Sequence, residues 1–118
     1  MANQQVLGAA GEDLAAVWLA ERGYILLHRN WRSGHCEVDI IAHLGPVLHF
    51  IEVKTRRNKK FGEPEESVDN KKIRNLLKAG EEFQYQYPQW KRVQYDVLSI
   101  SLFSGKEAEY FFIADVYL

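Results

Sequence analysis

Cysteine is almost absent from this sequence, since Cys36 is the only one in 118 residues. A single cysteine excludes a disulfide within the chain and a zinc site built from several cysteines. No base pattern lies near Cys36, so a cysteine nucleophile is not expected. A chain without disulfides fits a reducing compartment, and we therefore expect a cytoplasmic protein.

Long hydrophobic runs are also missing. The apolar-dominated stretch from Leu14 to Leu19 is far shorter than the roughly 20 residues that a membrane-spanning helix needs. The residues from Met1 to Gln5 hold no basic segment and no cleavage-site pattern, so we expect no secretion signal. Together these absences predict no membrane partner.

Net charge is low, and a value of −1 at pH 7 argues against a protein that coats nucleic acid without specificity. The cations are unevenly distributed, however. Five of the seven residues from Lys54 to Lys60 are Lys or Arg, and four more follow between Lys71 and Lys78. A run of this kind is usually a solvated loop, but this one begins at the candidate site described below.

Size and patterning predict one domain covering residues 1–118, because 47% hydrophobic and 26% charged residues are ordinary values for a globular protein. Helical spacing predicts helices over 3–22 and 67–87, and Pro88 ends the second. Apolar runs separated by glycine-containing turns predict strands over 24–31, 37–44, 47–55, 93–101 and 109–118. The order αβββαββ predicts an α/β fold with a mixed sheet flanked by helices.

Two neighbouring predicted strands each carry an acid among apolar residues. Asp39 lies between Val38 and Ile40, and Glu52 and Lys54 end the next strand on one face. Such groups are rarely buried unless they pair with each other or with a metal. A structural salt bridge between Asp39 and Lys54 is the simpler alternative.

Paired carboxylates and an ammonium suit the hydrolysis of phosphodiesters. Mg²⁺ or Mn²⁺ prefers oxygen ligands, which Asp39 and Glu52 can supply, with a backbone carbonyl near Val53 as a possible third. A bound metal lowers the pKa of its water and neutralises developing negative charge. Lys54 can then hold the attacking water or the scissile phosphate.

Three further residues have two interpretations each. Glu12 either reaches the site as an extra ligand for metal or water, or is an ordinary acid near a helix start. The adjacent Gly8 and Gly11 permit close approach of another backbone. Lys72 either binds phosphate or is a surface lysine, and Glu37 is expected at an exposed or hydrogen-bonded strand edge. The four histidines lack metal-ligand spacing, and ordinary strand histidines are expected.

Three segments in this order resemble the bacterial YraN-like family. They are Gly8-x-x-Gly11-Glu12, Gly34 to Ile41 (Gly-His-Cys-Glu-Val-Asp-Ile-Ile) and Phe50 to Arg56 (Phe-Ile-Glu-Val-Lys-Thr-Arg). Further matches are Gly62, Val68, Lys72 and the run Tyr95-Asp96-Val97. The resemblance covers nearly the whole chain, from about Gly8 to Tyr117.

That family is similar in turn to the archaeal Holliday junction resolvases and the wider PD-(D/E)xK nucleases, whose restriction-endonuclease-like core is αβββαβ. The resemblance implies that Asp39, Glu52 and Lys54 are catalytic, that Glu12 is the helix acid and that Lys72 is an auxiliary base. Val38 replaces the proline of the first motif, and the resemblance assigns no role to Asp96.

These expectations lead to one leading function and two alternatives. The first is a Mg²⁺- or Mn²⁺-dependent endonuclease acting on branched or structured DNA, with a homodimer implied by analogy to resolvases. The alternatives are a non-catalytic nucleic-acid-binding module and a structural protein whose acids form a buried salt-bridge network. The residues predicted to bind the nucleic-acid backbone are Arg56, Arg57, Lys59, Lys60 and Lys72.

Overall fold

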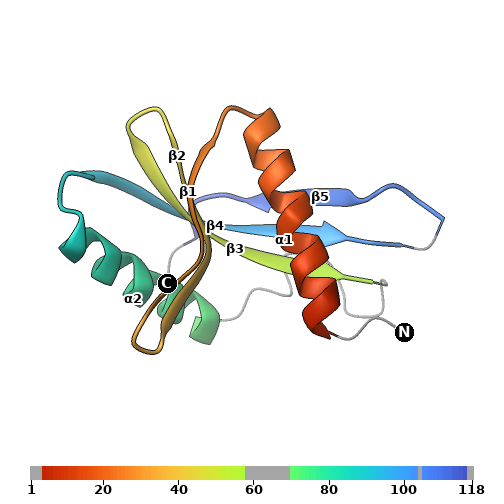
Figure 1. Cartoon of the computed structure of the whole chain (residues 1–118), viewed down its shortest axis with the longest axis horizontal. Coiled ribbons are helices and arrows are strands. Elements are labelled where there is room, and N and C mark those ends of the chain that lie inside the picture. Colours follow the sequence, from red (N-terminus) through yellow and green to blue (C-terminus); the bar gives the residue numbers. More distant parts are fainter. Residues whose placement is uncertain (1–3, 58–69, 104, 117–118) are drawn as a thin grey trace.

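The computed structural model describes residues 4–57, 70–103 and 105–116 of the chain. The elements are α1 (Gln4–Glu21), β1 (Ile25–Ser33), β2 (Cys36–Leu44), β3 (Val47–Arg56), α2 (Asn70–Gln86), β4 (Arg92–Ser101) and β5 (Glu109–Ile113) (Figure 1). The predicted order αβββαββ is therefore confirmed. As far as the structure describes them, neither helix is long and apolar enough to cross a membrane.

The five strands form one mixed sheet in the order β1-β2-β3-β4-β5. The first three strands are joined by antiparallel pairing, and β4 pairs antiparallel with β5. Between them, β3 and β4 run parallel over their whole lengths, with α2 connecting them in sequence. The strand that carries Glu52 and Lys54 is thus the centre of the sheet.

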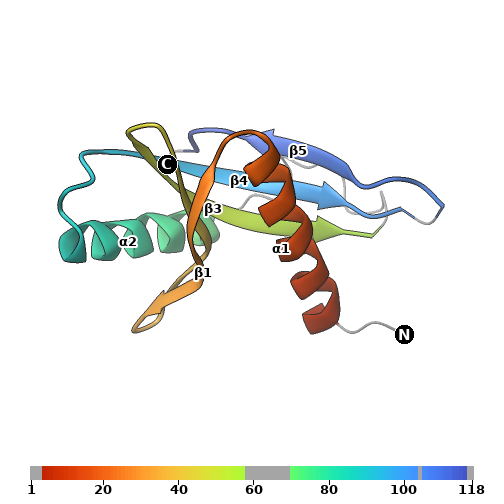
Figure 2. The same cartoon turned by 45° about the horizontal axis from the view of Figure 1, so that its top comes forward.

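The two helices cover opposite faces of this sheet, because successive residues of a strand point to opposite sides. Ile40 and Ile51 belong to one buried cluster, which contains Ala15 and Leu19 of α1. Their immediate neighbours in the chain, Ile41 after Ile40 and Phe50 before Ile51, belong to a second buried cluster. That cluster contains Leu76, Ala79 and Phe83 of α2, and two views show the helices on separate sides (Figures 1 and 2).

Glycines at positive φ make both tight hairpin turns. Gly34 (φ 59°) connects β1 to β2, and Gly45 (φ 57°) connects β2 to β3. Only glycine adopts this backbone conformation without steric cost. Both predicted turns are confirmed, although β1 continues to Ser33, two residues beyond its predicted end.

The last strand is shorter than predicted. A strand over 109–118 was expected, but β5 ends at Ile113. Asp115, two residues after the end of β5, has φ 59°, in the left-handed region rather than the extended one. Its N–H donates to Asp96 Oδ1 at 2.8 Å, and the N–H of Val116 donates to the carbonyl of Tyr95 at 2.7 Å. The prediction was wrong there because these hydrogen bonds turn the chain back onto β4.

Close packing of α1 on β3 occurs at Gly11. A Cβ atom at this position would collide with Oγ1 of Thr55. The absence of a side chain at Gly11 therefore lets the helix lie close to β3, where it meets the side chain of Thr55 rather than another backbone.

Candidate active site

The candidate site lies where β2 and β3 separate. Their antiparallel ladder runs from Leu44 opposite Val47 to Ile40 opposite Ile51. Beyond the last pair of this ladder, the Val53 N–H donates a hydrogen bond to Oδ2 of Asp39 at 2.8 Å. A side-chain carboxylate has thus replaced a strand carbonyl as the acceptor, which fixes Asp39 relative to the backbone of β3.

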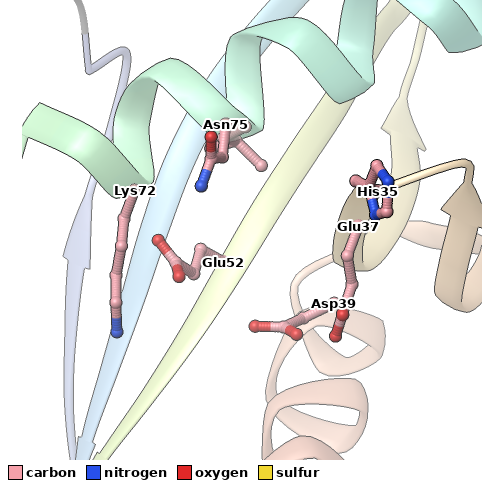
Figure 3. Close-up of a pocket in the computed structure, with 7 residues that line it drawn as sticks. His35, Glu37, Asp39, Glu52, Lys72 and Asn75 are labelled. Atoms are coloured by element: carbon pink, nitrogen blue, oxygen red, sulfur yellow. The ribbon is translucent and has the colours of Figure 1, made fainter.

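A pocket of about 290 Å³ opens beside this hydrogen bond. Asp39 and Glu52 present their carboxylates from neighbouring strands, and Lys72 and Asn75 reach down from α2 (Figure 3). The β1–β2 hairpin closes another side with His35 and Glu37. The complete lining is His35, Glu37, Asp39, Glu52, Lys72, Asn75 and Leu76.

Lys54 lies next to the pocket on the same face of β3 as Glu52. Its Nζ is 3.5 Å from Oε1 of Glu52, and both side chains are largely buried. Burial lowers the pKa of Lys54 below its usual value, and a hydrogen bond with Lys72 and the charge of Lys72 add to this effect. Glu52 acts in the opposite direction. Lys54 therefore has both a carboxylate and a second ammonium group as close neighbours.

Asp39 is the most perturbed acid of the site. Burial raises its pKa from 3.8 to about 6, although the hydrogen bond from Val53 opposes the shift. The charges of Glu12, Glu52 and Glu37 raise it further. Ionising Asp39 is costly because it is buried among other acids. A bound cation would offset that cost, so the position favours cation binding.

Glu12 approaches the site from the opposite helix. Its charge acts on Asp39, and its carboxylate lies 3.9 Å from the guanidinium of Arg29. Arg29 binds the neighbouring Asp13 more closely, at 2.8 Å. The Gly11 contact with Thr55 places Glu12 beside the end of β3, and a role for Glu12 at the site stays a prediction.

The donor set fits Mg²⁺ or Mn²⁺ better than zinc. In the part of the chain that the structure describes, no three or more His, Cys, Asp and Glu side chains form a metal-binding group. Asp39 and Glu52 supply two hard oxygen donors beside an open pocket. One or two carboxylates completed by waters and substrate oxygens are a usual environment for Mg²⁺. The two acids would hold the metal.

The predicted phosphate contacts are only partly described. Arg56 is 8% exposed at the end of β3 and does not face solvent, whereas Arg57 is exposed. Lys72 lines the pocket, and its contact with phosphate stays a prediction. Lys59 and Lys60 lie outside the described residues, as do Gly62 and Val68 of the family pattern and the predicted start of the second helix.

Sequence reasoning missed Asn75 altogether and gave His35 no role. Asn75 follows Lys72 by three residues, so both project from one side of α2. This spacing was the available signal. Glu37 was expected at a strand edge, and it is indeed half exposed and paired with Arg32 at 3.4 Å, yet it also lines the pocket.

Asp96 has a structural role on the other face of the sheet. Its fully buried carboxylate lies 2.6 Å from Nδ1 of His49. It also accepts hydrogen bonds from Nε2 of Gln94 and the N–H of Asp115, each at 2.8 Å. A carboxylate only accepts hydrogen bonds, so Nδ1 of His49 carries the hydrogen. Asp96 thereby connects β3, β4 and the segment after β5.

Comparison with known proteins identifies a family. Residues 11–100 match the family described as "Uncharacterised protein family UPF0102". A UPF0102 protein of Rhodococcus opacus is 42% identical over 118 residues, which cover 99% of this chain and 100% of the relative. A UPF0102 protein of Dictyoglomus thermophilum is 40% identical over 117 residues, covering 98% and 99%. One of Bacteroides thetaiotaomicron is 41% identical over 100 residues, covering 85% and 83%.

Proposed function

This chain belongs to the uncharacterised protein family UPF0102, and we propose that it is a metal-dependent endonuclease that hydrolyses phosphodiester bonds in branched or structured DNA. The proposal includes a restriction-endonuclease-like core. One observation carries it: Asp39 and Glu52 face a single pocket from adjacent strands, and the pKa of Asp39 is raised to about 6. A salt bridge between Asp39 and Lys54, the structural alternative, is absent from the ion pairs of the described residues.

The roles of the residues follow from their positions. A Mg²⁺ or Mn²⁺ ion bound here supplies neutralisation of phosphate charge and a water of lowered pKa. Asp39 and Glu52 hold it, while the Val53 N–H keeps Asp39 in one orientation. Lys54, 3.5 Å from Glu52, donates a hydrogen bond to the attacking water or to a phosphate oxygen.

Two charged residues complete the proposed site. Lys72 projects into the pocket from α2 and holds a non-bridging phosphate oxygen there. Glu12 acts through its charge on Asp39 from the α1 side and orients water at the edge of the site. The exposed Arg57 holds the DNA backbone beyond the pocket. A homodimer would place two such sites on the two strands of a junction, and sedimentation equilibrium measures that state.

The test is cleavage of end-labelled duplex, single strand, flap and four-way junction in Mg²⁺ or Mn²⁺. We expect metal-dependent cutting by the wild type, with branched substrates preferred. Asp39→Asn and Lys54→Ala should each reduce the rate on the order of 10²-fold or more, because each removes a group that acts on the reacting phosphate. Asp39→Asn should bind DNA at least as well as the wild type, because a negative charge near phosphate is removed.

Asp13→Asn is the matched control. It removes the same charge from an exposed acid beside Glu12 that forms only a surface ion pair with Arg29, and it should cut at the wild-type rate. Undiminished cutting by Asp39→Asn would show that the site is assigned wrongly. Salt-dependent binding without cutting by the wild type would instead support the non-catalytic module.

A further inference from the structure

The exposed side of α2 carries a second set of cations outside the pocket. Lys71, Arg74 and Lys78 are all exposed. Their spacing of three and four residues puts them on one side of the helix, within about 60° of arc. We call these three residues the α2 basic row.

The α2 basic row has no anionic partner within the part of the chain that the structure describes. No carboxylate there lies within ion-pair distance of any of its members. Arg29 and Arg32, which are also exposed cations, both pair with acids. Within the described residues, the like charges of three cations at this spacing repel one another, so they are not explained by ion pairs of the helix.

The row continues into the candidate site. Viewed down the helix axis, Asn75 is rotated about 40° from Lys71, and Lys72 is rotated about 60° further in the same direction. Asn75 and Lys72 line the pocket that contains Asp39 and Glu52 (Figure 3). A polyanion lying along the row would therefore lead directly to the proposed scissile phosphate.

The length of the row limits the contact. Lys71 and Lys78 are seven residues apart, or about 10 Å along the helix. Glu81 and Glu82 occupy the following turn and disfavour phosphate there. Since each strand of duplex DNA carries a phosphate every 3.4 Å or so of its axis, the row can contact about three phosphates.

We infer that the α2 basic row binds the backbone of one strand of a DNA duplex arm whose continuation enters the pocket. This inference rests on the proposed function and specifies its substrate as double-stranded beside the cut. A groove for single strands combines cations with stacking aromatic rings, and the row contains none. Tyr85, 84% exposed, lies on α2 only beyond the two acids.

The experiment compares two triple variants with equal loss of charge. The first is Lys71→Gln/Arg74→Gln/Lys78→Gln, which keeps good helix formers on an exposed face. The second, Lys91→Gln/Arg92→Gln/Lys106→Gln, removes three exposed cations that lie before β4, at its first residue and between β4 and β5. Binding to a labelled four-way junction, a linear duplex and a single strand is measured by fluorescence anisotropy in EDTA over a range of salt concentrations.

We expect the α2 triple to bind the junction and the duplex at least tenfold more weakly at about 0.1 M salt, and the control triple to change binding less than twofold. The slope of log affinity against log salt should fall by about 0.9 for each phosphate that the variant no longer neutralises, or by about 2 to 3 in all. Single-strand binding should change as little as it does in the control.

Cutting rates at saturating substrate separate this inference from the proposed function. If the α2 triple binds DNA with the same affinity as the control triple while the wild type cuts DNA, the inference about the row is wrong. The proposed nuclease activity is then still supported. If the α2 triple binds duplex more weakly but neither the wild type nor the variants cut DNA, the contact of the row with duplex is supported and the nuclease activity is not. A wild type that binds no duplex, or a row that affects single strands equally, overturns the inference.

Discussion

Asp39 is the residue at which stability and proposed activity conflict. Its folded pKa of about 6 lies above the ordinary value of 3.8, so its contribution to stability is complete below about pH 4 and is lost as pH rises through 6. The shift corresponds to about 3 kcal/mol at most. We expect Asp39→Asn to be more stable than the wild type at pH 7, by on the order of 2 kcal/mol, and to lose that advantage near pH 4.

Urea unfolding of both proteins at several pH values measures this difference. The distant acids titrate alike in both proteins, so the difference reports Asp39 together with its coupling to Glu12, Glu37 and Glu52. Addition of Mg²⁺ at pH 7 should stabilise the wild type and leave Asp39→Asn unchanged, because binding to the folded state alone raises its stability. Parallel pH profiles for the two proteins would contradict the raised pKa.

Asp96 is a different kind of buried acid, because both of its carboxylate oxygens have hydrogen-bond partners. Asp96→Asn puts an NH₂ group where only acceptors fit, and one of the donors from His49, Gln94 or Asp115 loses its partner. We expect a loss of about 2 to 4 kcal/mol in urea unfolding. Asp13→Asn, at an exposed ion pair, should cost less than about 1 kcal/mol. Equal losses would mean that the Asp96 network contributes little.

Some residues around the pocket could be identified from the sequence, and others could not. Asp39 and Glu52 could be predicted because a charged residue within an apolar strand is rare and needs a reason. Asn75 had only the three-residue spacing from Lys72 as a signal, which is weak because a polar residue on an exposed helix face is ordinary. The role of Asp96 depends on hydrogen bonds between β3, β4 and the chain after β5, which no local pattern contains.

At the scale of elements, the contact between α1 and β3 depends on a residue without a side chain. Gly11→Ala puts a methyl group against Thr55, and overpacking of this kind typically costs about 1 to 3 kcal/mol. Alanine is the better helix former by about 1 kcal/mol, so a net loss shows that the clash dominates. We expect thermal unfolding to reveal such a loss, together with weaker cleavage as Glu12 moves away.

Thr55→Ala in the same background removes the colliding oxygen and should recover part of the stability. The four proteins form a double-mutant cycle whose coupling reports the contact directly. Additive effects would show that the two residues do not touch.

Elements with strong local signals were predicted well. The hairpin turns at Gly34 and Gly45 follow from the need for positive φ, and the strands alternate between two buried clusters as apolar runs should. The end of β5 was wrong because Asp115 leaves the extended region to meet Asp96, a partner 19 residues away. Local propensity contains no information about such a partner.

The whole molecule offers tryptophan probes on both faces of the sheet. Trp18 stacks on Tyr110 on the α1 side at 5.7 Å, and Trp31 packs edge-on against Phe83 on the α2 side at 5.3 Å. Because both clusters share the same strands, residues 1–118 should unfold as one cooperative domain. Variants that keep only Trp18 or only Trp31 should show coincident denaturant transitions by fluorescence. Separated midpoints would indicate two independent units.

The sheet topology was beyond the reach of sequence patterns. The order of elements and the mixed character of the sheet could be predicted, because strands followed by a helix and further strands favour that arrangement. The parallel register of β3 and β4 pairs residues more than 40 positions apart, from Val47 with Arg92 to Arg56 with Ser101. Packing against both helices selects this pairing, and that is a property of the complete chain.

The hydrogen bond from the Val53 N–H to Asp39 makes a backbone resonance an indicator of the site. In an NMR titration the Val53 amide proton should move upfield as Asp39 becomes protonated, with a midpoint near pH 6. A divalent cation bound by the carboxylate should lower that midpoint. Occupancy could then be followed in solution without any substrate, and even in a variant that has lost Lys54.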